Sequence, residues 1–378
     1  MQALAVFPER RRVAIIEEDE PRTLGPQQIL LRTREVGVCG TDREIAAFAY
    51  GERPAGSDHL VLGHEALAEV VELGSEVSHF QRGQLAVPMV RRPCPDPRCR
   101  PCRAGRQDFC ATEEFLERGI KGADGFLAEL FVEEEQNLIP VPPGLADVGV
   151  LIEPLTVIAK GMVKVRAFRE RLPWEPMFEK ALVLGAGAVG LLSAMCAVSN
   201  GYDTTVYSRE PSDGERAAYV RGFGASYVSS VETPLGDLGR KVGKVGELES
   251  SGPFDLLVEA AGFSPLTIAG LGVLGPNGIA VLKGVPALGP EQAIDIDRLL
   301  RSVVLKNQVV FGTVNAGRSD YFDAMHLLEA LVVRFPESVR HFITARYPLE
   351  AAPELLSRSE GIKDVVRFDG ATPRGRAS

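Results

Sequence analysis

Cys39, His64 and Glu153 combine metal-binding chemistry with apolar surroundings in the sequence. The cysteine follows Val-Gly-Val, the histidine follows Leu-Val-Leu-Gly, and the glutamate lies in 148–155, which is otherwise almost entirely apolar. Burying such groups without partners is costly, and one cation bound by all three would remove that cost. Thiolate, imidazole and carboxylate are all zinc ligands, and three protein ligands leave the fourth position of a catalytic zinc open. We therefore predict a catalytic zinc site at these residues.

Four other cysteines lie close together with the spacing C-x4-C-x2-C-x7-C: Cys94, Cys99, Cys102 and Cys110. The N-terminal apolar stretch is too short for a signal peptide, so clustered thiols favour structural zinc over disulfides. The prolines between them make a loop that could hardly fold without a metal. We predict a structural zinc lobe here, with free thiols on a surface loop as the alternative.

Composition excludes several classes of protein. The chain has 378 residues, 45% apolar and 25% charged, which suits two globular domains. Its net charge of −9 and pI near 5.3 argue against nucleic-acid and anionic-membrane partners. No apolar run reaches the roughly 18–20 residues of a membrane span. We expect a cytoplasmic protein.

The first 150 residues are predicted to be mainly β structure. Short alternating runs recur between Pro, Gly and charged turns, as in an irregular barrel or a pair of sheets. These runs are 3–6, 13–16, 29–32, 66–73, 85–90 and 126–132. A helix is expected over 41–49, with Thr41 or Asp42 as its N-cap.

The remainder carries the pattern of a dinucleotide-binding fold. A five-residue strand at 180–184 runs directly into Gly-Ala-Gly-Ala-Val-Gly, and a helix follows at 191–200. In this context the G-x-G-x-x-G motif allows the backbone to approach a pyrophosphate at the helix N-terminus. We predict cofactor contacts at the motif residues Gly185, Gly187, Ala188, Val189 and Gly190.

The second strand of this fold, at 204–207, ends in a sequence that favours NADP. An acidic residue usually binds the adenosine ribose when NAD is preferred. Here Ser208 and Arg209 occupy the end of the strand, and Arg209 could pair with a 2′-phosphate. Because Glu210 follows directly, binding of the ribose of NAD stays open.

Three further strands are expected at 254–259, 278–282 and 309–311. In a doubly wound parallel sheet, ligands bind at the carboxyl ends of the strands. The residues that follow these strands are therefore predicted near the cofactor: Gly262, Gly284, Val285, Thr313 and Asn315.

These motifs resemble those of the zinc-containing medium-chain dehydrogenase/reductase superfamily over nearly the full chain. The matching segments follow one another in the family's order: 39–42, 63–65, the four cysteines and 185–190. Within this superfamily the chain is most similar to glucose 1-dehydrogenases, through the segments 91–92, 105–110, 119–122, 208–211 and 312–317. The resemblance implies a GroES-like catalytic domain (1–160 and 316–378), a Rossmann domain (161–315) and a homotetramer or dimer.

The resemblance also implies roles for particular residues. Cys39, His64 and Glu153 become the catalytic zinc ligands, with Glu65 as a fourth, exchangeable ligand or a hydrogen-bonded neighbour. Thr41 would pass the substrate proton to solvent, and Glu114, Glu153 and Asn315 would bind sugar hydroxyls. The implied reaction oxidises an aldose, first of all D-glucose, at C1 to the lactone and reduces NADP or NAD. The first cysteine gap is x4 instead of the family's x2, which leaves open whether Cys94 belongs to the structural site.

Other interpretations remain open on the sequence. The substrate could be another polyol, an alcohol or L-threonine, and a non-catalytic NADPH-binding protein is a further alternative. His64 and Glu65 could form a core ion pair, Thr41 an N-cap, Glu114 a solvated surface acid, and Asn315 the cap of a strand end.

Overall fold

The computed structural model describes residues 1–174, 179–238, 253–286, 293–357 and 361–368. The chain divides into two compact units. Unit 1 comprises Met1–Thr156, Asn315–Glu329 and Val339–Ser378, and unit 2 comprises Val157–Val314 and Ala330–Ser338. Residues 330–338 thus belong to unit 2, although the division expected from the sequence assigned them to the catalytic domain. Residues 330–334 are the last part of one long helix, Arg318–Arg334, so the sequence shows no break at the point where unit 2 begins again.

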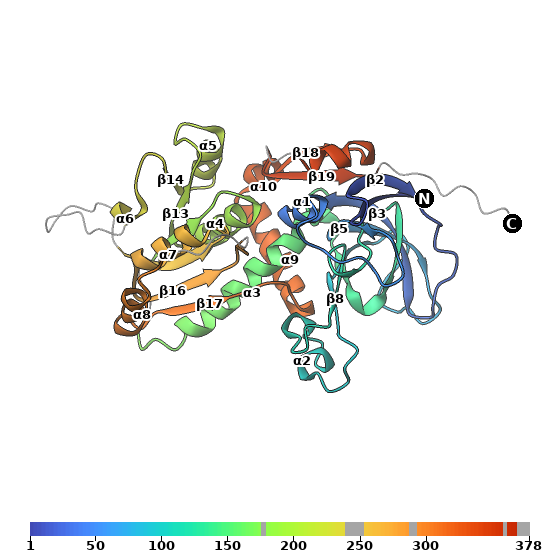
Figure 1. Cartoon of the computed structure of the whole chain (residues 1–378), viewed down its shortest axis with the longest axis horizontal. Coiled ribbons are helices and arrows are strands. Elements are labelled where there is room, and N and C mark those ends of the chain that lie inside the picture. Colours follow the sequence, from blue (N-terminus) through green and yellow to red (C-terminus); the bar gives the residue numbers. More distant parts are fainter. Residues whose placement is uncertain (175–178, 239–252, 287–292, 358–360, 369–378) are drawn as a thin grey trace. The chain divides into compact units, whose positions relative to one another are not determined.

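Unit 1 is built mainly from β-strands (Figure 1). Its strands are β1 (Gln2–Phe7), β2 (Arg12–Glu17), β3 (Gln28–Gly37), β4 (Leu60–Val61), β5 (Glu65–Leu73), β6 (Leu85–Pro88), β7 (Arg91–Arg92), β8 (Leu116–Arg118), β9 (Gly122–Ala123), β10 (Leu130–Glu134), β11 (Leu138–Val141), β18 (Ile343–Tyr347) and β19 (Lys363–Arg367). Helices α1 (Gly40–Ala46), α2 (Arg100–Arg103) and α11 (Ala352–Leu355) lie in this unit, whereas α3 (Ile152–Arg169), α9 (Arg318–Arg334) and α10 (Pro336–Phe342) contribute residues to both units.

The largest sheet of unit 1 has seven strands in the order β11-β6-β5-β3-β19-β18, with β10 also paired to β3. Alternate residues of these strands bury apolar side chains in one core, which includes Leu31, Val36, Leu62, Phe126 and Val366. This core supports the central strands β3, β5 and β19.

Strand register brings the end of β3 to the start of β5. The two strands are antiparallel and Gly37 lies opposite Glu65. Cys39 comes two residues after Gly37, and His64 directly precedes Glu65. Both therefore lie just beyond the paired region, at the same end of the two strands. Strand β19 pairs with β3 on its other side, with Val365 opposite Gly37, which brings Lys363 to this end of the strands as well.

Unit 2 contains a six-stranded parallel sheet in the order β14-β13-β12-β15-β16-β17. The strands are β12 (Lys180–Leu184), β13 (Asp203–Ser208), β14 (Ser226–Ser229), β15 (Phe254–Glu259), β16 (Leu274–Leu282) and β17 (Val309–Gly312). The helices are α4 (Ala188–Ser199), α5 (Glu215–Gly222), α6 (Leu235–Leu238), α7 (Ser264–Val273) and α8 (Ile296–Leu305). The doubly wound α/β fold predicted from the sequence is confirmed.

Some elements differ from the sequence prediction. Helix α1 ends at Ala46 instead of Ala49, because Phe48 adopts a left-handed conformation with φ of 61°. Its N-cap is Cys39, and Asp42 is the third residue of the helix, whose carboxylate accepts the Cys39 amide at 2.8 Å. The strand expected over 126–132 begins only at Leu130.

The Gly-rich and charged sequence of 233–251 predicts a linker-like segment, and that of 369–378 predicts a disordered tail. Of these residues, the structure describes only 233–238. Each helix among the described residues is too short or too polar to span a bilayer.

Candidate active site

Cys39, His64 and Glu65 form a compact group of potential metal ligands in unit 1, which we call the metal-ligand group. One ligand atom from each lies within 4.8 Å of the other two. His64 and Glu65 are buried and Cys39 is partly buried. The group is assembled by the β3–β5 pairing described above, which joins segments 25 residues apart in the sequence. The structure thus brings together the cysteine and histidine predicted from the sequence, with the neighbouring glutamate.

Asp42 orients the imidazole of His64. Its Oδ1 lies 3.3 Å from Nδ1 of His64, while its Oδ2 accepts the Cys39 amide. Burial acts to lower the pKa of His64, but the Asp42 carboxylate and Cys39 outweigh it, so the pKa is raised. Neither His64 Nδ1 nor Asp42 Oδ1 has a well-aligned hydrogen bond to a described residue, although both atoms are buried. A cation on Nε2 would leave the Nδ1 proton facing this carboxylate, which is the usual support for a metal-bound histidine.

Lys363, which the sequence analysis missed, holds the carboxylate of Glu65. Its Nζ lies 2.8 Å from Oε1 and 2.6 Å from Oε2, and both side chains are only 3% exposed. Burial acts to lower the pKa of Lys363, but the attraction of Glu65 and Cys39 outweighs it and the pKa is raised. The signal available in the sequence was a lysine two residues before the apolar pair Val365-Val366 of strand β19.

Glu153 begins α3 and lies outside the 4.8 Å group. It is nevertheless close enough to interact electrostatically with His64, Glu65 and Lys363. Burial, together with repulsion from Glu65, raises the pKa of Glu153 to about 7. A cation at the group would relieve this repulsion. The structure therefore places Glu153 beside the predicted site without bringing its oxygens among the three closest ligand atoms.

Thr41 lies in the first turn of α1 and is not the N-cap. Its Oγ1 is 4.0 Å from Sγ of Cys39. The hydroxyl is therefore next to the metal-ligand group, and it is not needed to cap the helix.

The donor set fits zinc. Sulfur, nitrogen and oxygen donors from Cys39, His64 and Glu65 are close together and mostly buried, and two buried polar atoms behind them have no well-aligned partner. A divalent cation would neutralise the carboxylates and thiolate that the fold has collected there.

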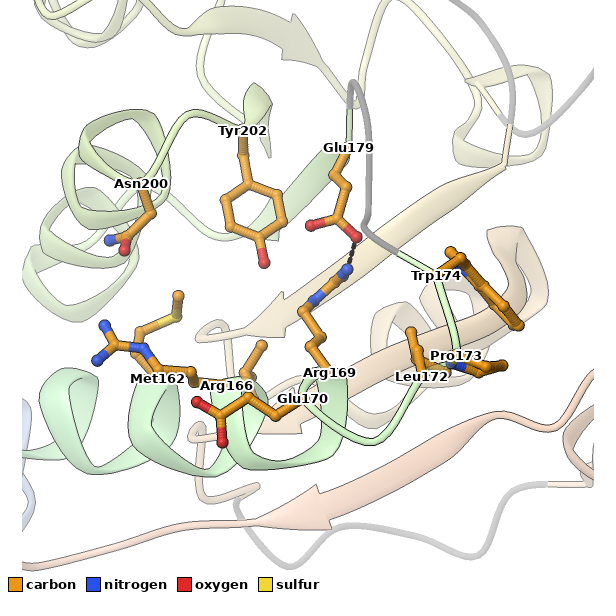
Figure 2. Close-up of a pocket in the computed structure, with 11 residues that line it drawn as sticks. Met162, Arg166, Arg169, Glu170, Leu172, Pro173, Trp174, Glu179, Asn200 and Tyr202 are labelled. Carbon is orange, nitrogen blue, oxygen red and sulfur yellow. Dashed lines mark ion pairs between the residues drawn. The ribbon is translucent and has the colours of Figure 1, made fainter.

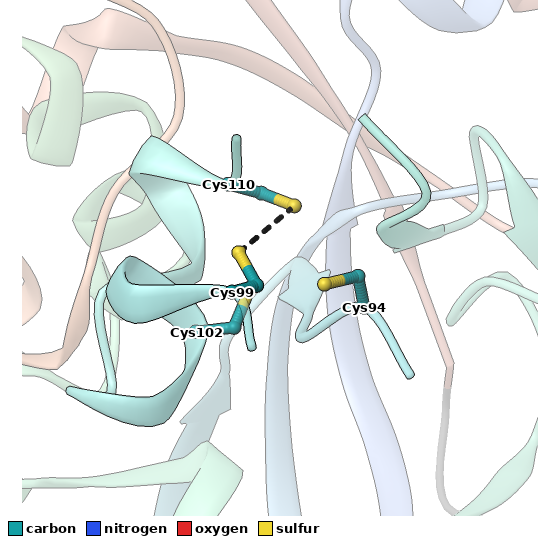
Figure 3. A group of neighbouring side chains, drawn as sticks. All are labelled: Cys94, Cys99, Cys102 and Cys110. Carbon is teal, nitrogen blue, oxygen red and sulfur yellow. Dashed lines mark hydrogen bonds between the residues drawn. The ribbon is translucent and has the colours of Figure 1, made fainter. Parts of the chain in front are cut away.

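The four clustered cysteines also converge, Cys94 included (Figure 3). Their sulfur atoms all lie within 4.8 Å of one another, and the Cys99 and Cys110 sulfurs are 4.0 Å apart. Burial opposes ionisation of Cys110, but hydrogen bonds from Thr112 and the neighbouring thiols lower its pKa to about 6. Burial raises the pKa of Cys102 to about 12. Four converging thiols are suited to a zinc ion, and the x4 gap does not keep Cys94 away.

Asn315 pairs with a glutamate that the sequence analysis did not select. Its Nδ2 donates to Oε1 of Glu117 at 2.7 Å, and Arg91 donates to the same oxygen through Nε at 3.1 Å and Nη2 at 2.9 Å. Glu117 is buried, and its Oε2 has no hydrogen bond to any described residue. The predicted Glu114 is instead exposed, and its one hydrogen bond with a described residue is from its backbone amide to Thr112 Oγ1.

The turn that carries Glu117 packs against the metal-ligand group. A Cβ on Gly119, which has φ of 73°, would lie 2.4 Å from the carbonyl oxygen of Gly63. Only glycine fits this approach, and Gly63 directly precedes His64. The Glu117 oxygen without a hydrogen bond to a described residue is therefore held on a turn that contacts Gly63, next to His64.

The glycine motif of unit 2 has the geometry of a dinucleotide site. A Cβ on Gly190 would lie 2.1 Å from the Gly185 carbonyl oxygen, so the turn requires glycine there. Gly187 is the N-cap of α4, and a Cβ on it would meet no atom within 4 Å. Open space in front of a twelve-residue helix N-terminus fits a pyrophosphate. Ala188 and Val189 form the first turn of this helix.

Two residues follow β13 directly: Arg209, which is exposed, and Glu210, whose carboxylate is hydrogen-bonded. Glu210 Oε2 accepts the Ser208 hydroxyl at 2.5 Å and the Tyr227 hydroxyl at 3.3 Å. Burial opposes its ionisation, but the Ser208 hydrogen bond outweighs this and lowers the pKa of Glu210. Arg209 is exposed and makes no hydrogen bond or ion pair with a described residue. Of the two residues, Arg209 is the one available to a 2′-phosphate.

Glu259, also missed by the sequence analysis, joins two of the predicted cofactor loops. Its Oε1 accepts the amides of Ala261 and Gly262, each at 2.8 Å, and its Oε2 accepts that of Gly284 at 3.2 Å. The adjacent Val285 is 77% exposed and thus available to a ligand. Thr313, the remaining predicted residue, has a buried Oγ1 without a partner among the described residues. These features fit a bound cofactor.

A cavity in unit 2 lies at the opposite ends of these strands. Its volume is about 600 Å³, and it is lined where β12 and β13 begin (Figure 2). Arg169 crosses it from α3 to pair with Glu179, and its guanidinium lies 5.4 Å from the centre of the Tyr202 ring. Because parallel strands bind ligands at their carboxyl ends, this cavity is separate from the predicted cofactor site.

Two family models match successive parts of the chain. Residues 25–143 match the family model of the alcohol dehydrogenase GroES-like domain, and residues 146–368 match that of the glucose dehydrogenase C-terminus. Glucose 1-dehydrogenase of Methanocella arvoryzae is 37% identical over 373 residues, which cover 97% of this chain and 99% of that protein. Glucose 1-dehydrogenase of Thermoproteus tenax is 40% identical over 364 residues, 94% of this chain and 95% of that protein.

Solved structures agree with these relatives. The structure of Haloferax mediterranei glucose dehydrogenase in complex with NADP, Zn and gluconolactone superposes with a TM-score of 0.87. It is 30% identical in sequence, and the match covers 98% of this chain and 100% of that one.

Proposed function

Because this chain belongs to the glucose 1-dehydrogenase family of zinc-containing medium-chain dehydrogenases, we propose that it oxidises D-glucose, or a closely related aldose, at C1 to the lactone with NADP as hydride acceptor. Unit 1 is proposed as the catalytic domain and unit 2 as the cofactor domain. The observation that carries the proposal is the largely buried Cys39–His64–Glu65 group, next to a turn whose Glu117 keeps one carboxylate oxygen free of hydrogen bonds to the described residues.

Each residue has a distinct task in this proposal. Cys39, His64 and either Glu65 or Glu153 would hold the zinc, with Asp42 orienting the imidazole. When bound, zinc acts as a Lewis acid that lowers the pKa of a hydroxyl group, as it does for water, from about 15.7 to roughly 7. The Thr41 hydroxyl lies next to Cys39, and therefore next to the proposed zinc. From there it would accept the anomeric proton and pass it to solvent.

Recognition of the sugar is proposed for Glu117 and Asn315. Three N–H donors occupy Oε1 of Glu117, so its Oε2 is left to accept a sugar hydroxyl. A plain alcohol cannot supply that hydroxyl and would leave the buried oxygen unpaired, which disfavours its binding. We propose Glu117 for the role that the resemblance assigned to Glu114.

The cofactor is proposed to bind at Gly185, Gly187, Ala188, Val189 and Gly190, with Ser208 and Arg209 near the 2′-phosphate. Gly262, Gly284, Val285 and Thr313 would line the rest of the site. NADP supplies the hydride acceptor when bound, and NAD is the alternative cofactor.

Metal content and a substrate panel test the proposal. We expect about two zinc ions per chain and NADP reduction that depends on glucose. The panel should include galactose, xylose, a polyol, a plain alcohol and L-threonine, each with both cofactors. Turnover of a polyol or of threonine with inert aldoses would replace the substrate assignment. Zinc without turnover on any of them would instead support a non-catalytic NADPH-binding protein.

Replacing Arg209 should shift cofactor preference. Arg209→Ala is expected to raise the KM for NADP about tenfold, because an arginine–phosphate pair is a strong charge-assisted contact. The KM for NAD should stay nearly constant. Arg221→Ala, a change of another exposed arginine on α5 of unit 2, is the matched control. A wild-type protein that strongly prefers NAD would contradict the assignment of Arg209.

A homo-oligomer is proposed to form through the β17 end of the unit 2 sheet. β17 is the last strand in the sheet order, and unpaired edge strands invite pairing with another chain. Beside it in the chain, α8 exposes Leu300 by 54% and Val304 by 73%. A second copy related by a two-fold axis would pair the strand and cover both side chains.

Light scattering tests this interface. Leu300→Asp should lower the molar mass to that of one chain. The same change at Val231, which is 73% exposed elsewhere in unit 2, should not alter the mass. A wild-type monomer would refute the proposal.

A cytoplasmic location is proposed because the six cysteines are free and four of them form a metal-binding group. Reducing compartments preserve such thiols.

A further inference from the structure

The four-cysteine lobe, residues 94–110, contacts both groups that hold Glu117. We propose that this lobe positions the sugar-binding carboxylate, with Arg106 and Asp108 as positioning residues. The inference rests on the proposed function, because it assumes that Glu117 binds the sugar. It adds a task to a lobe whose metal would otherwise serve only the stability of a loop.

The first connection runs from the lobe to Arg91. The backbone carbonyl of Asp108 accepts a hydrogen bond from Arg91 Nη1 at 3.4 Å. The side-chain Nε2 of Gln107 donates to the backbone carbonyl of Arg91 at 3.3 Å. Arg91, Gln107 and Asp108 are all buried. The Arg91 guanidinium also stacks on Phe115, 3.6 Å from the ring centre. The plane of this guanidinium, which directs Nε and Nη2 at Glu117, is therefore set partly by the lobe.

The second connection runs from the lobe to the loop that carries Asn315. Arg106 pairs with Asp108 through Nε at 2.9 Å and Nη2 at 2.7 Å, and Nη2 also reaches Asp320 Oδ2 at 3.2 Å. The same Asp320 oxygen accepts the Gly317 amide at 2.8 Å. Arg106 packs so closely that a Cβ on Gly317 would lie 2.7 Å from its Nε. Gly317 is two residues from Asn315, so the lobe fixes this loop as well.

The two connections meet at one atom. Arg91 and Asn315 both donate to Oε1 of Glu117, although they are more than 200 residues apart in the sequence. Three consecutive lobe residues, 106–108, thus contact both of the elements that supply these donors. If this segment moved, the donors would lose their alignment and Glu117 could rotate. Because hydrogen-bond energy falls steeply with misalignment, the sugar would bind less tightly.

Arg106→Gln and Asp108→Asn test the inference in the full-length zinc-bound protein. Each should raise the KM for glucose about fivefold, as expected for the partial loss of a charge-assisted hydrogen bond. The value of kcat and the KM for NADP should change less than about twofold, because the metal ligands and the cofactor residues keep their contacts. Arg103→Gln, which alters an exposed arginine of the same lobe, is the matched control and should change nothing.

Binding without turnover gives a second readout. 1,5-Anhydroglucitol has no anomeric hydroxyl and cannot be oxidised at C1, so calorimetric titration with it reports the hydroxyl contacts alone. Its Kd should rise in both variants by the same factor as the KM for glucose. Zinc per chain should equal that of the wild type, which separates positioning from loss of the lobe metal.

Gly317→Ala covers the case in which Arg106→Gln or Asp108→Asn does not fold. It changes no lobe residue but adds a Cβ that would lie 2.7 Å from Arg106 Nε and 2.9 Å from Asp108 Oδ1, so this pair must shift and the KM for glucose should rise in the same way. Equal losses in kcat and in affinity for both substrates would indicate a merely structural role and overturn the inference.

Glu117→Gln separates the inference from the function on which it rests. If Glu117→Gln raises the KM for glucose and the Arg106, Asp108 and Gly317 variants do not, the lobe has no positioning role. If Glu117→Gln itself has no effect, the proposed sugar site is wrong and the lobe inference falls with it.

Discussion

Cys39→Ser is expected to lower kcat for glucose oxidation by about a thousandfold or more, because it removes the sulfur donor from the proposed zinc site, whose metal would contribute several kcal/mol to the transition state. A serine hydroxyl is a poor zinc ligand at neutral pH, whereas the thiolate is a strong one. We expect zinc to fall from about two ions per chain to about one, since the four lobe cysteines are untouched. The measurements are steady-state kinetics and metal analysis of the purified protein.

The fold should survive this change. Cys39 is the N-cap of α1 and is only partly buried, so little packing is lost. Cys196→Ala is the matched control, because Cys196 is buried in α4 of unit 2 and belongs to neither metal-ligand group. That control should keep its activity and both zinc ions. A Cys39→Ser protein with wild-type turnover would refute the catalytic site.

Glu117→Gln should raise the KM for glucose about tenfold, because a neutral amide replaces the charged acceptor of a sugar hydroxyl. The amide oxygen can still face Arg91 and Asn315, so the side chain should stay in place. Glu114→Gln is the comparison that decides between the two glutamates. Glu114 is exposed and its carboxylate has no hydrogen bond to a described residue, so no change in KM is expected.

The opposite result would restore the assignment made by resemblance. A raised KM for Glu114→Gln with an unchanged KM for Glu117→Gln would mean that the sugar contacts the exposed carboxylate instead. The KM for NADP serves as the internal control in both variants, since the proposed cofactor residues lie in unit 2.

Features that depend on local sequence were predicted well. The glycines at 185–190 lie between a strand and a helix because hydrophobic run, turn and helix follow one another directly in the chain. The four cysteines converge because they lie within 17 residues, so little chain entropy opposes their meeting around one ion. The strand at 254–259 agrees with β15 in both bounds, since its apolar residues are buried on both faces of a parallel sheet.

Pairings between distant segments could not be predicted in the same way. Lys363 meets Glu65 only because β19 and β5 pair with opposite edges of β3, and sequence periodicity predicts a strand without naming its neighbours. Glu114 and Glu117 are the same residue type, three positions apart in the sequence. Only the packing of Gly119 on Gly63, and the hydrogen bond from Asn315, distinguish the buried carboxylate from the exposed one.

The sequence alone therefore determined which chemical groups this protein has: a thiol and an imidazole for a metal, a glycine turn for a dinucleotide and a cysteine lobe. Tertiary structure decided which carboxylates accompany them and which cations hold those carboxylates. The physical reason is that the chain carries 51 acidic residues, and an acidic residue gains a specific role only when folding removes its water and supplies particular donors. That selection depends on strand register and close backbone contacts, which are properties of the folded chain.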